Sequence, residues 1–292
     1  TNFYGLRDAY RPYDIYVDST TFPDAYINDD DAIIEAFRQA PAFDGTPTFI
    51  QFHLMSSHGL GLRHDANIRY RPQQSPYGIH LHRRLPEGTD LEGITNYYDN
   101  GVIQTDVNFA RIEELLREKG YLDDALLILT GDHGELLGEG GYVTHARSTE
   151  EPVLAPPLLV RRYAPAGAAS SAIRLAPIAS QVDVAPTILS AIGVPIPHSW
   201  SGVPLQETIR ARRIFFSQGR EVGLYESTAN SVHKVVVDSR SGAMRAWRWM
   251  GGVTLRPEPI EAGPIATPRQ EEWRTALQSE LGMAWTGTVE GE

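Results

Sequence analysis

Two loops that contain histidine follow two of the most apolar segments of this sequence. Residues 48–55 are aliphatic and aromatic, which predicts a buried strand, and they run into a small polar loop that contains His58. Residues 125–130 are similarly apolar, and they run into the glycine-flanked pair Asp132 and His133. Carboxylate and imidazole groups are ligands that divalent metals take in proteins. The pair Asp132–His133 could therefore hold one divalent ion.

A third imidazole, His145, follows His133 by twelve residues and comes after the glycine-rich run 138–141. A flexible loop of this kind could return His145 to the same site. Other interpretations stay open, because an Asp–His pair at a strand end often forms a turn, and a loop histidine such as His58 often bonds to backbone. Glu135 resembles the start of a zinc metalloprotease motif, but no His-Glu-x-x-His is present, which disfavours that activity.

The framework that positions these loops is predicted from the flanking segments. Residues 108–119 have the apolar spacing of an amphipathic helix, and the apolar strand 125–130 follows it. A helix followed by a continuous apolar strand is typical of a parallel sheet covered on both faces. We therefore expect an α/β fold with a mainly parallel central sheet. Ligands bind outside the carboxyl ends of such strands, so His58, Asp132 and His133 should meet there.

The pattern changes near residue 210, beyond which several short strands are expected. We predict two parts, residues 1–209 and a small β-rich piece at residues 210–292 that ends in a helix. A short strand at 157–160 and a helix at 184–192 belong to the first part, and the second part has strands at 214–216, 222–225, 233–237 and 244–249, a turn at 239–242 and a helix at 268–281.

Composition excludes several classes of function. The net charge is −11, from 26 basic and 37 acidic residues, so nucleic-acid binding has no electrostatic support. A bound metal can still attract an anionic small substrate. No apolar run is long enough for a membrane span, and the absence of cysteine rules out disulfides and thiolate chemistry. His64, His80 and His82 lie in a polar region, and we expect them to be solvated.

Longer stretches of the sequence resemble a known family. Residues 52–59 resemble the strand and loop of bacterial phosphoethanolamine transferases and lipoteichoic acid synthases, which belong to the alkaline phosphatase and sulfatase superfamily. Residues 97–100 resemble the segment that opens the next helix, and residues 119–145 resemble the most diagnostic block of that family. Residues 182–194 are similar to a later helix shared across sulfatases. The resemblance covers about residues 47–205, in the family's order and spacing.

The resemblance implies a fold of the alkaline phosphatase type and roles for four residues. Asp132 and His133 would bind a divalent metal, with zinc or manganese favoured and calcium possible. His58 and His145 would be catalytic residues that contact a phosphate or sulfate ester, with phosphate slightly favoured because many calcium sulfatases have an amide where His133 stands. The reaction would be hydrolysis or transfer through a covalent enzyme intermediate. Leu60 departs from the family, which usually has proline there.

The resemblance does not supply the attacking group. The family's nucleophile and a further acidic metal ligand both precede the matched region. In residues 1–46 the only hydroxyl cluster is 19–21, and Phe22 and Pro23 follow it instead of a helix start. We therefore expect the nucleophile-bearing N-terminal part of the protein to be missing, and this chain to be inactive by itself. An extracytoplasmic or membrane-anchored parent is suggested by the resemblance only. The competing hypothesis is a non-catalytic sulfatase-like domain that binds an anionic ligand or a partner.

Overall fold

A computed structural model shows two compact units, each assembled from several segments of the chain. The first unit comprises Thr1–Ala125, Leu136–Thr144 and Tyr163–Ala168, and the second comprises Leu126–Glu135, His145–Arg162 and Ala169–Glu292. The hydroxyl cluster 19–21, His80 and His82 lie outside the described residues. The structure describes residues 14–17, 28–76, 84–145, 148–165, 178–207, 211–228, 231–250, 260–261 and 267–282.

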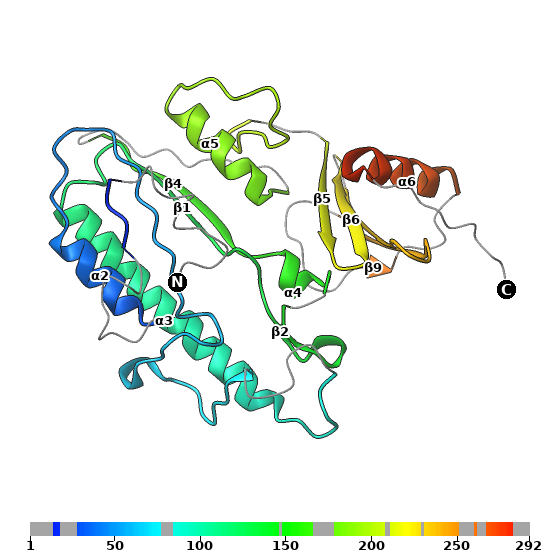
Figure 1. The fold of residues 1–292 in the computed structure, drawn as a ribbon, viewed down its shortest axis with the longest axis horizontal. Coiled ribbons are helices and arrows are strands. Elements are labelled where there is room, and N and C mark those ends of the chain that lie inside the picture. The colour runs from blue at the N-terminus through cyan, green and yellow to red at the C-terminus, as the bar shows by residue number, and fades with distance from the viewer. Residues whose placement is uncertain are drawn as a thin grey trace. The chain divides into compact units, whose positions relative to one another are not determined.

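Two helices form the core of the first unit and lie side by side, α2 (Asp30–Gln39) and α3 (Leu91–Glu118) (Figure 1). The Asp29 side chain caps α2 by accepting a hydrogen bond from the backbone of Asp31. The short helix η2 (Asp65–Asn67) also contacts α3. The buried apolar residues of this core are Ile34, Phe37, Ile112, Leu115 and Leu116, and Ile50, Phe52 and Leu54 pack against them.

Helix α3 is longer than the sequence predicts. It begins at Leu91, where the Asp90 side chain accepts a hydrogen bond from the backbone of Gly93, and it continues for 28 residues. The predicted helix at residues 108–119 is therefore only its last part. None of the described helices is both long and apolar enough to cross a membrane.

The apolar segment 48–55 is not a strand, so that prediction is wrong. At its end, the backbone N–H groups of Met55 and Ser56 donate to the carboxylate of Asp30, at 2.7 and 2.9 Å. A side chain therefore satisfies donors that a neighbouring strand would otherwise bind. The described strands of the first unit are the short antiparallel pair β2 (Leu136–Leu137) and β3 (Val143–Thr144), joined through η4 (Glu139–Gly141).

The second unit contains the strand that precedes Asp132. This strand, β1 (Leu126–Thr130), pairs antiparallel with β4 (Leu158–Arg162) and contacts α5 (Val184–Ala191). The short helices α4 (Glu151–Leu154) and η5 (Gln181–Asp183) precede β4 and α5. The expected mixture of helices and strands is confirmed, as is the helix at 184–192. Every strand pair in the described residues is antiparallel, so the parallel pairing expected for the central sheet is not seen in that part of the chain.

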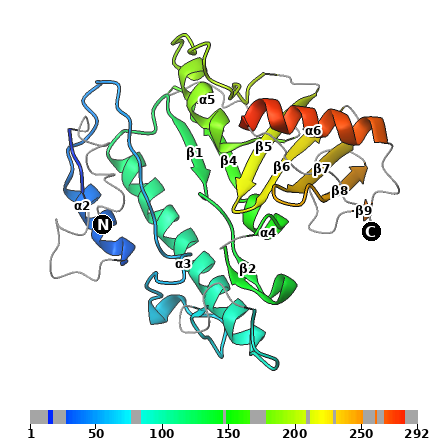
Figure 2. The same cartoon turned by 45° about the vertical axis from the view of Figure 1, so that its right-hand side comes forward.

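A five-stranded antiparallel sheet and a closing helix form the β-rich C-terminal piece, as predicted. Helix α6 (Thr267–Leu281) lies across one face of the sheet (Figure 2), where Trp273 and Leu277 pack on Val222, Leu224, Val235 and Val237. The division at residue 209 stays a prediction. The strands run in chain order as β5 (Arg212–Gln218), β6 (Glu221–Ser227), β7 (Ser231–Asp238), β8 (Met244–Met250) and β9 (Ile260–Glu261).

Candidate metal centre

His133, Glu135 and His145 form a cluster within the second unit. The loop after β1 carries His133 and Glu135, and the chain returns to this loop at His145. The centroids of the two imidazole rings lie 3.9 Å apart, and the ring planes are tilted by 37°. One potential ligand atom from each of the three residues lies within 4.8 Å of the others. His133 and His145, which the sequence predicts as site residues, therefore lie together with Glu135, which the sequence did not predict as part of this site.

In both imidazoles the hydrogen bond is made by Nδ1, so Nε2 is the ring nitrogen that can bind a ligand. Nδ1 of His133 lies 3.0 Å from the carbonyl oxygen of Gly134, and Nδ1 of His145 lies 3.1 Å from Oε1 of Glu135. A carbonyl or carboxylate oxygen only accepts, so each Nδ1 carries a proton and each neutral ring has its lone pair on Nε2. Metal-binding histidines are held in this way, with the second ring nitrogen donating to an oxygen.

Asp132 presents a carboxylate oxygen near the His133 ring. Its Oδ1 accepts a hydrogen bond from the backbone of His133 at 3.0 Å, and its Oδ2 lies 3.6 Å from Nε2 of His133. Two ligands at about 2.0–2.1 Å from a tetrahedral zinc lie about 3.3 Å apart, so this spacing suits one shared ion. Gln181 holds the loop in place, because its side chain donates to the carbonyl oxygens of Gly131 and Asp132 at 2.7 and 2.6 Å.

Glu135 supplies an observation that points to a cation. Its Oε2 atom is buried and has no hydrogen-bond partner in the part of the chain that the structure describes. A buried carboxylate oxygen without a donor is costly, and a metal ion nearby would remove that cost. The hydrogen bond that Glu135 accepts from the His145 ring also raises the pKa of His145. Imidazole nitrogens and carboxylate oxygens together fit zinc or manganese.

Sequence reasoning missed Glu135 because it tested this residue only against the metalloprotease pattern. Its partner, His145, lies ten residues away, a distance at which no short motif links two residues. The one available signal was its place on the same loop as Asp132 and His133.

His58 lies in the first unit, on a turn that is well connected to α3. Its Nδ1 accepts a hydrogen bond from the backbone N–H of Leu60 at 3.1 Å. The proton of the neutral ring is therefore on Nε2. Because Asp132, His133 and His145 belong to the second unit, the predicted meeting of His58 with these residues stays a prediction.

His64 is half-buried, so the expectation of a solvated side chain is wrong. Its Nε2 lies 3.2 Å from Oδ1 of Asp29 and 3.4 Å from Oδ2 of Asp31. These three residues have the composition of a second metal site. The guanidinium of Arg111, however, also binds Asp31 and balances its charge. We assign this cluster to fastening the start of α2.

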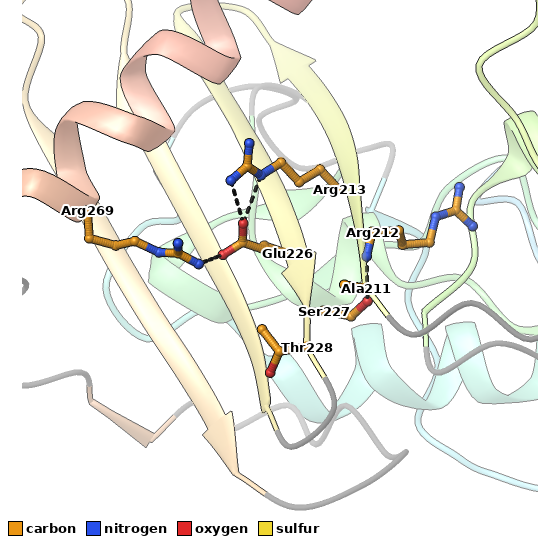
Figure 3. Close-up of a pocket in the computed structure, with 7 residues that line it drawn as sticks. All are labelled: Ala211, Arg212, Arg213, Glu226, Ser227, Thr228 and Arg269. Atoms are coloured by element: carbon orange, nitrogen blue, oxygen red, sulfur yellow. Dashed lines mark hydrogen bonds and ion pairs between the residues drawn. The ribbon is translucent and has the colours of Figure 1, made fainter.

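A cavity of about 350 Å³ opens on the second unit (Figure 3). Its lining residues lie between positions 211 and 269, and none of them is a histidine. Arg213 and Arg269 both bind Glu226, and Figure 3 shows that carboxylate between the two guanidinium groups. Arg212 binds Asp183 through two hydrogen bonds, at 2.6 and 2.8 Å. An anionic ester would have to displace a carboxylate here, so the ion pairs fasten α6 and η5 to the sheet. The cavity is lined by Ala211, Arg212, Arg213, Glu226, Ser227, Thr228 and Arg269.

The sequence of this chain was compared with protein families and with individual proteins, and it matches one family. The profile of the Sulfatase family matches residues 1–194 of this chain. The low-salt glycan biosynthesis sulfotransferase Agl7 of Haloferax volcanii is 33% identical over 151 residues, which are 47% of this chain and 36% of that protein. The N-acetylglucosamine-6-O-sulfatase of Bacteroides thetaiotaomicron is 34% identical over 110 residues, 37% of this chain and 19% of that protein.

The solved structures that resemble this chain carry names of the same kind. The sulfatase candidate yidJ of Bacteroides fragilis aligns with a TM-score of 0.46 and 18% identity, over 68% of this chain and 45% of that one. The family assignment rests on the sequence match to residues 1–194. The chain spans about a third or less of the length of the two curated relatives it matches.

Proposed function

Because this chain belongs to the sulfatase family, we propose that it binds a divalent metal at Asp132 and His133 and acts there on a sulfate or phosphate ester. The observation that carries this proposal is the group of ligand atoms that the loop after β1 forms with His145. It combines two imidazoles whose Nδ1 protons are both bound to oxygens with a buried carboxylate oxygen that lacks a donor.

The metal would be held first by Asp132 and His133, with the carboxylate of Glu135 beside them. Zinc or manganese suits the imidazole nitrogen best, and calcium is the alternative that the carboxylates would accept. When bound, such an ion polarises the ester oxygen and stabilises the charge that develops on it. The remaining chemistry falls to residues of this chain and to the nucleophile, which we assign to none of the described residues.

The two other histidines would contact the ester. Glu135 fixes the His145 ring through Nδ1, and Nε2 of that ring would contact the transferred group. His58 has its proton on Nε2 and would donate it as a hydrogen bond to an ester or leaving-group oxygen. The proposed reaction is hydrolysis or transfer through a covalent intermediate.

We propose a sulfate ester of a sugar as the substrate. The histidine at position 133 favoured phosphate, but the names of both curated relatives join sulfate chemistry to a sugar or glycan. The second candidate function is a non-catalytic domain that binds an anionic ligand. The exposed side chain of Asp132, 77% accessible, leaves a metal in the loop reachable for either role.

The test uses the intact protein and two matched variants. Asp132→Asn removes a charged ligand, and Asp106→Asn makes the same change on the exposed face of α3. Metal content is measured by elemental analysis, and turnover by hydrolysis of an aryl sulfate and an aryl phosphate with zinc, manganese or calcium supplied. We expect Asp132→Asn alone to lose both metal and turnover.

Each other outcome has a definite meaning. Equal metal content in Asp132→Asn and the unchanged protein would show that the ligand assignment is wrong. Metal binding without turnover of either ester by the intact protein would favour the non-catalytic function. Faster turnover of the aryl phosphate would contradict the sulfate assignment and leave the metal site intact.

A further inference from the structure

The turn that carries His58 is held through its carbonyl oxygens. Residues 58–61 form a tight turn in which the N–H of Gly61 donates to the carbonyl of His58 at 2.9 Å. Side chains from elsewhere in the first unit donate to the same turn. Tyr97 binds the carbonyl of Gly59 at 3.1 Å, and Asn28 binds that of Leu60 at 3.1 Å. A turn whose carbonyls are all engaged has little freedom to change its peptide orientations.

Arg63 makes the most contacts with this turn. Its Nη1 donates to the carbonyls of His58 and Gly61, at 2.8 and 2.6 Å, and its Nε donates to the carbonyl of Tyr97 at 3.2 Å. The side chain is buried, and the described residues include no carboxylate that pairs with it. A buried guanidinium without a counter-ion costs free energy. The charged group of Arg63 therefore binds only backbone carbonyl oxygens among the described residues. The burial of this charge lowers stability, and a role in positioning the turn would explain why the residue is there.

Helix α3 supplies the surface on which Arg63 lies. The guanidinium carbon is 3.8 Å from the centre of the Tyr97 ring, which stabilises the cation. One helical turn later, a side chain at Gly101 would place its Cβ only 2.6 Å from Nη2 of Arg63 and 2.7 Å from the carbonyl oxygen of Ser56. Because Gly101 has no side chain, the guanidinium of Arg63 and the carbonyl of Ser56 can both lie against the helix at this position.

The orientation of this turn decides which nitrogen of His58 holds the proton. Leu60 can donate to Nδ1 of His58 only while the peptide between Gly59 and Leu60 faces the ring. Tyr97 and Ser75 fix that peptide by binding its carbonyl, and Arg63 fixes the peptides that follow His58 and Gly61. If the turn relaxed, water could donate to or accept from either ring nitrogen, and both tautomers would be populated.

We propose that Arg63 is a positioning residue that, together with Tyr97 and the space left by Gly101, holds His58 as its Nε2–H tautomer for contact with the ester. This inference rests on the proposed function for the role of His58, but the tautomer itself is independent of turnover. Arg63 contacts neither substrate nor metal and acts only through the turn 58–61.

The principal test changes a single hydroxyl group. Tyr97→Phe removes one of the two side-chain bonds to the carbonyl of Gly59, the other coming from Ser75, and keeps the ring under Arg63. Tyr121→Phe is the matched control, since its hydroxyl donates to the carbonyl of Pro41 on the exposed surface. The tautomer is read from the ¹⁵N shifts of the His58 ring in histidine-labelled protein, assigned with His58→Gln. We expect mixed tautomers in Tyr97→Phe and a fall of about fivefold in kcat with KM nearly unchanged.

A second pair of variants tests the space at Gly101. Alanine favours a helix more than glycine does, so Gly101→Ala should stabilise α3 unless the close contact with Arg63 is real. Val102→Ala, at the exposed neighbouring position, is the control. We expect Gly101→Ala to lower the melting temperature and to mix the tautomers of His58, while Val102→Ala does neither.

The proposal is overturned if Tyr97→Phe and Gly101→Ala both leave the ¹⁵N shifts of His58 as in the unchanged protein, whatever happens to their melting temperatures. An intact protein that turns over no ester would refute the proposed function. The shifts would still decide whether Arg63 and Tyr97 control the tautomer, so the two failures are distinguishable.

Discussion

A buried ion pair fastens the segment after His145 to the C-terminal sheet. Lys234 on β7 is 2% exposed, and its Nζ donates to the carbonyl of Thr149 and, at 2.7 Å, to Oε1 of Glu151. The hydroxyl of Tyr225 also donates to this carboxylate, at 3.3 Å. Burial raises the pKa of Tyr225, so the hydroxyl keeps its proton. The pair lies within the second unit and joins residues 83 positions apart.

Lys234→Met tests how much this pair stabilises the second unit. Methionine keeps most of the apolar stem but leaves the Glu151 carboxylate buried with Tyr225 as its remaining side-chain donor. Removing one partner of a buried pair costs about 3–5 kcal/mol, a large part of a typical total of about 5–15 kcal/mol. The double variant Lys234→Met with Glu151→Gln buries no charge, so we expect it to regain most of that loss.

The assay is urea unfolding followed by tryptophan fluorescence, because Trp247, Trp249 and Trp273 lie in the sheet and on α6. Arg220→Met, an exposed change in the turn between β5 and β6, is the control and should cost little. The reasoning fails if Lys234→Met costs less than about 1 kcal/mol, the range of an exposed pair. It also fails if the double variant is as unstable as the single one.

Two further predictions concern histidines. Glu135→Gln should weaken metal binding by about 10–100-fold, because the site loses the charged carboxylate beside Asp132 and His133; titration calorimetry with zinc checks this, and unchanged affinity would contradict it. Burial lowers the pKa of His233, so the unfolded chain binds its proton more readily than the folded one does. Stability should therefore be full above the unfolded pKa of about 6.5 and fall as the pH drops toward the folded pKa. Urea unfolding should show a smaller fall for His233→Phe, and an equal fall would refute this cause.

Local patterns in the sequence were enough to predict the C-terminal elements. The strands β5 to β8, the turn between β7 and β8, and α6 lie where alternation and helical spacing place them. Each of these elements buries apolar side chains on a regular face, as Val235, Val237 and Leu277 show. Such faces produce the periodic signal on which sequence prediction depends.

Hydrophobic periodicity missed the first half of α3 for the opposite reason, although the family resemblance placed the opening of a helix at residues 97–100. Its inner face buries Asn100, Gln104 and Asn108, three amides that are at most 1% exposed. Asn100 binds the backbone of Arg69 and Tyr70, and Gln104 accepts hydrogen bonds from the backbone of His64 and the side chain of Asn67. In a sequence, amide side chains are usually taken for solvent-facing residues. The apolar spacing of the helix therefore becomes visible only at Ile112 and Leu115, which continue the same buried face.

The same physical cause explains both the wrong strand at 48–55 and the missed Glu135. In each case a carboxylate that is largely shielded from water has partners that are distant in the sequence: Asp30 binds the backbone of Met55 and Ser56, and Glu135 binds His145. Hydrophobic periodicity records only which side chains avoid water, whereas these contacts depend on which donors the fold brings to each carboxylate. An apolar run such as 48–55 can therefore end on a side chain instead of a neighbouring strand. Likewise, His145 reaches the loop that carries Asp132 and His133 only because the folded chain brings it back there, and Glu135 binds it at that point.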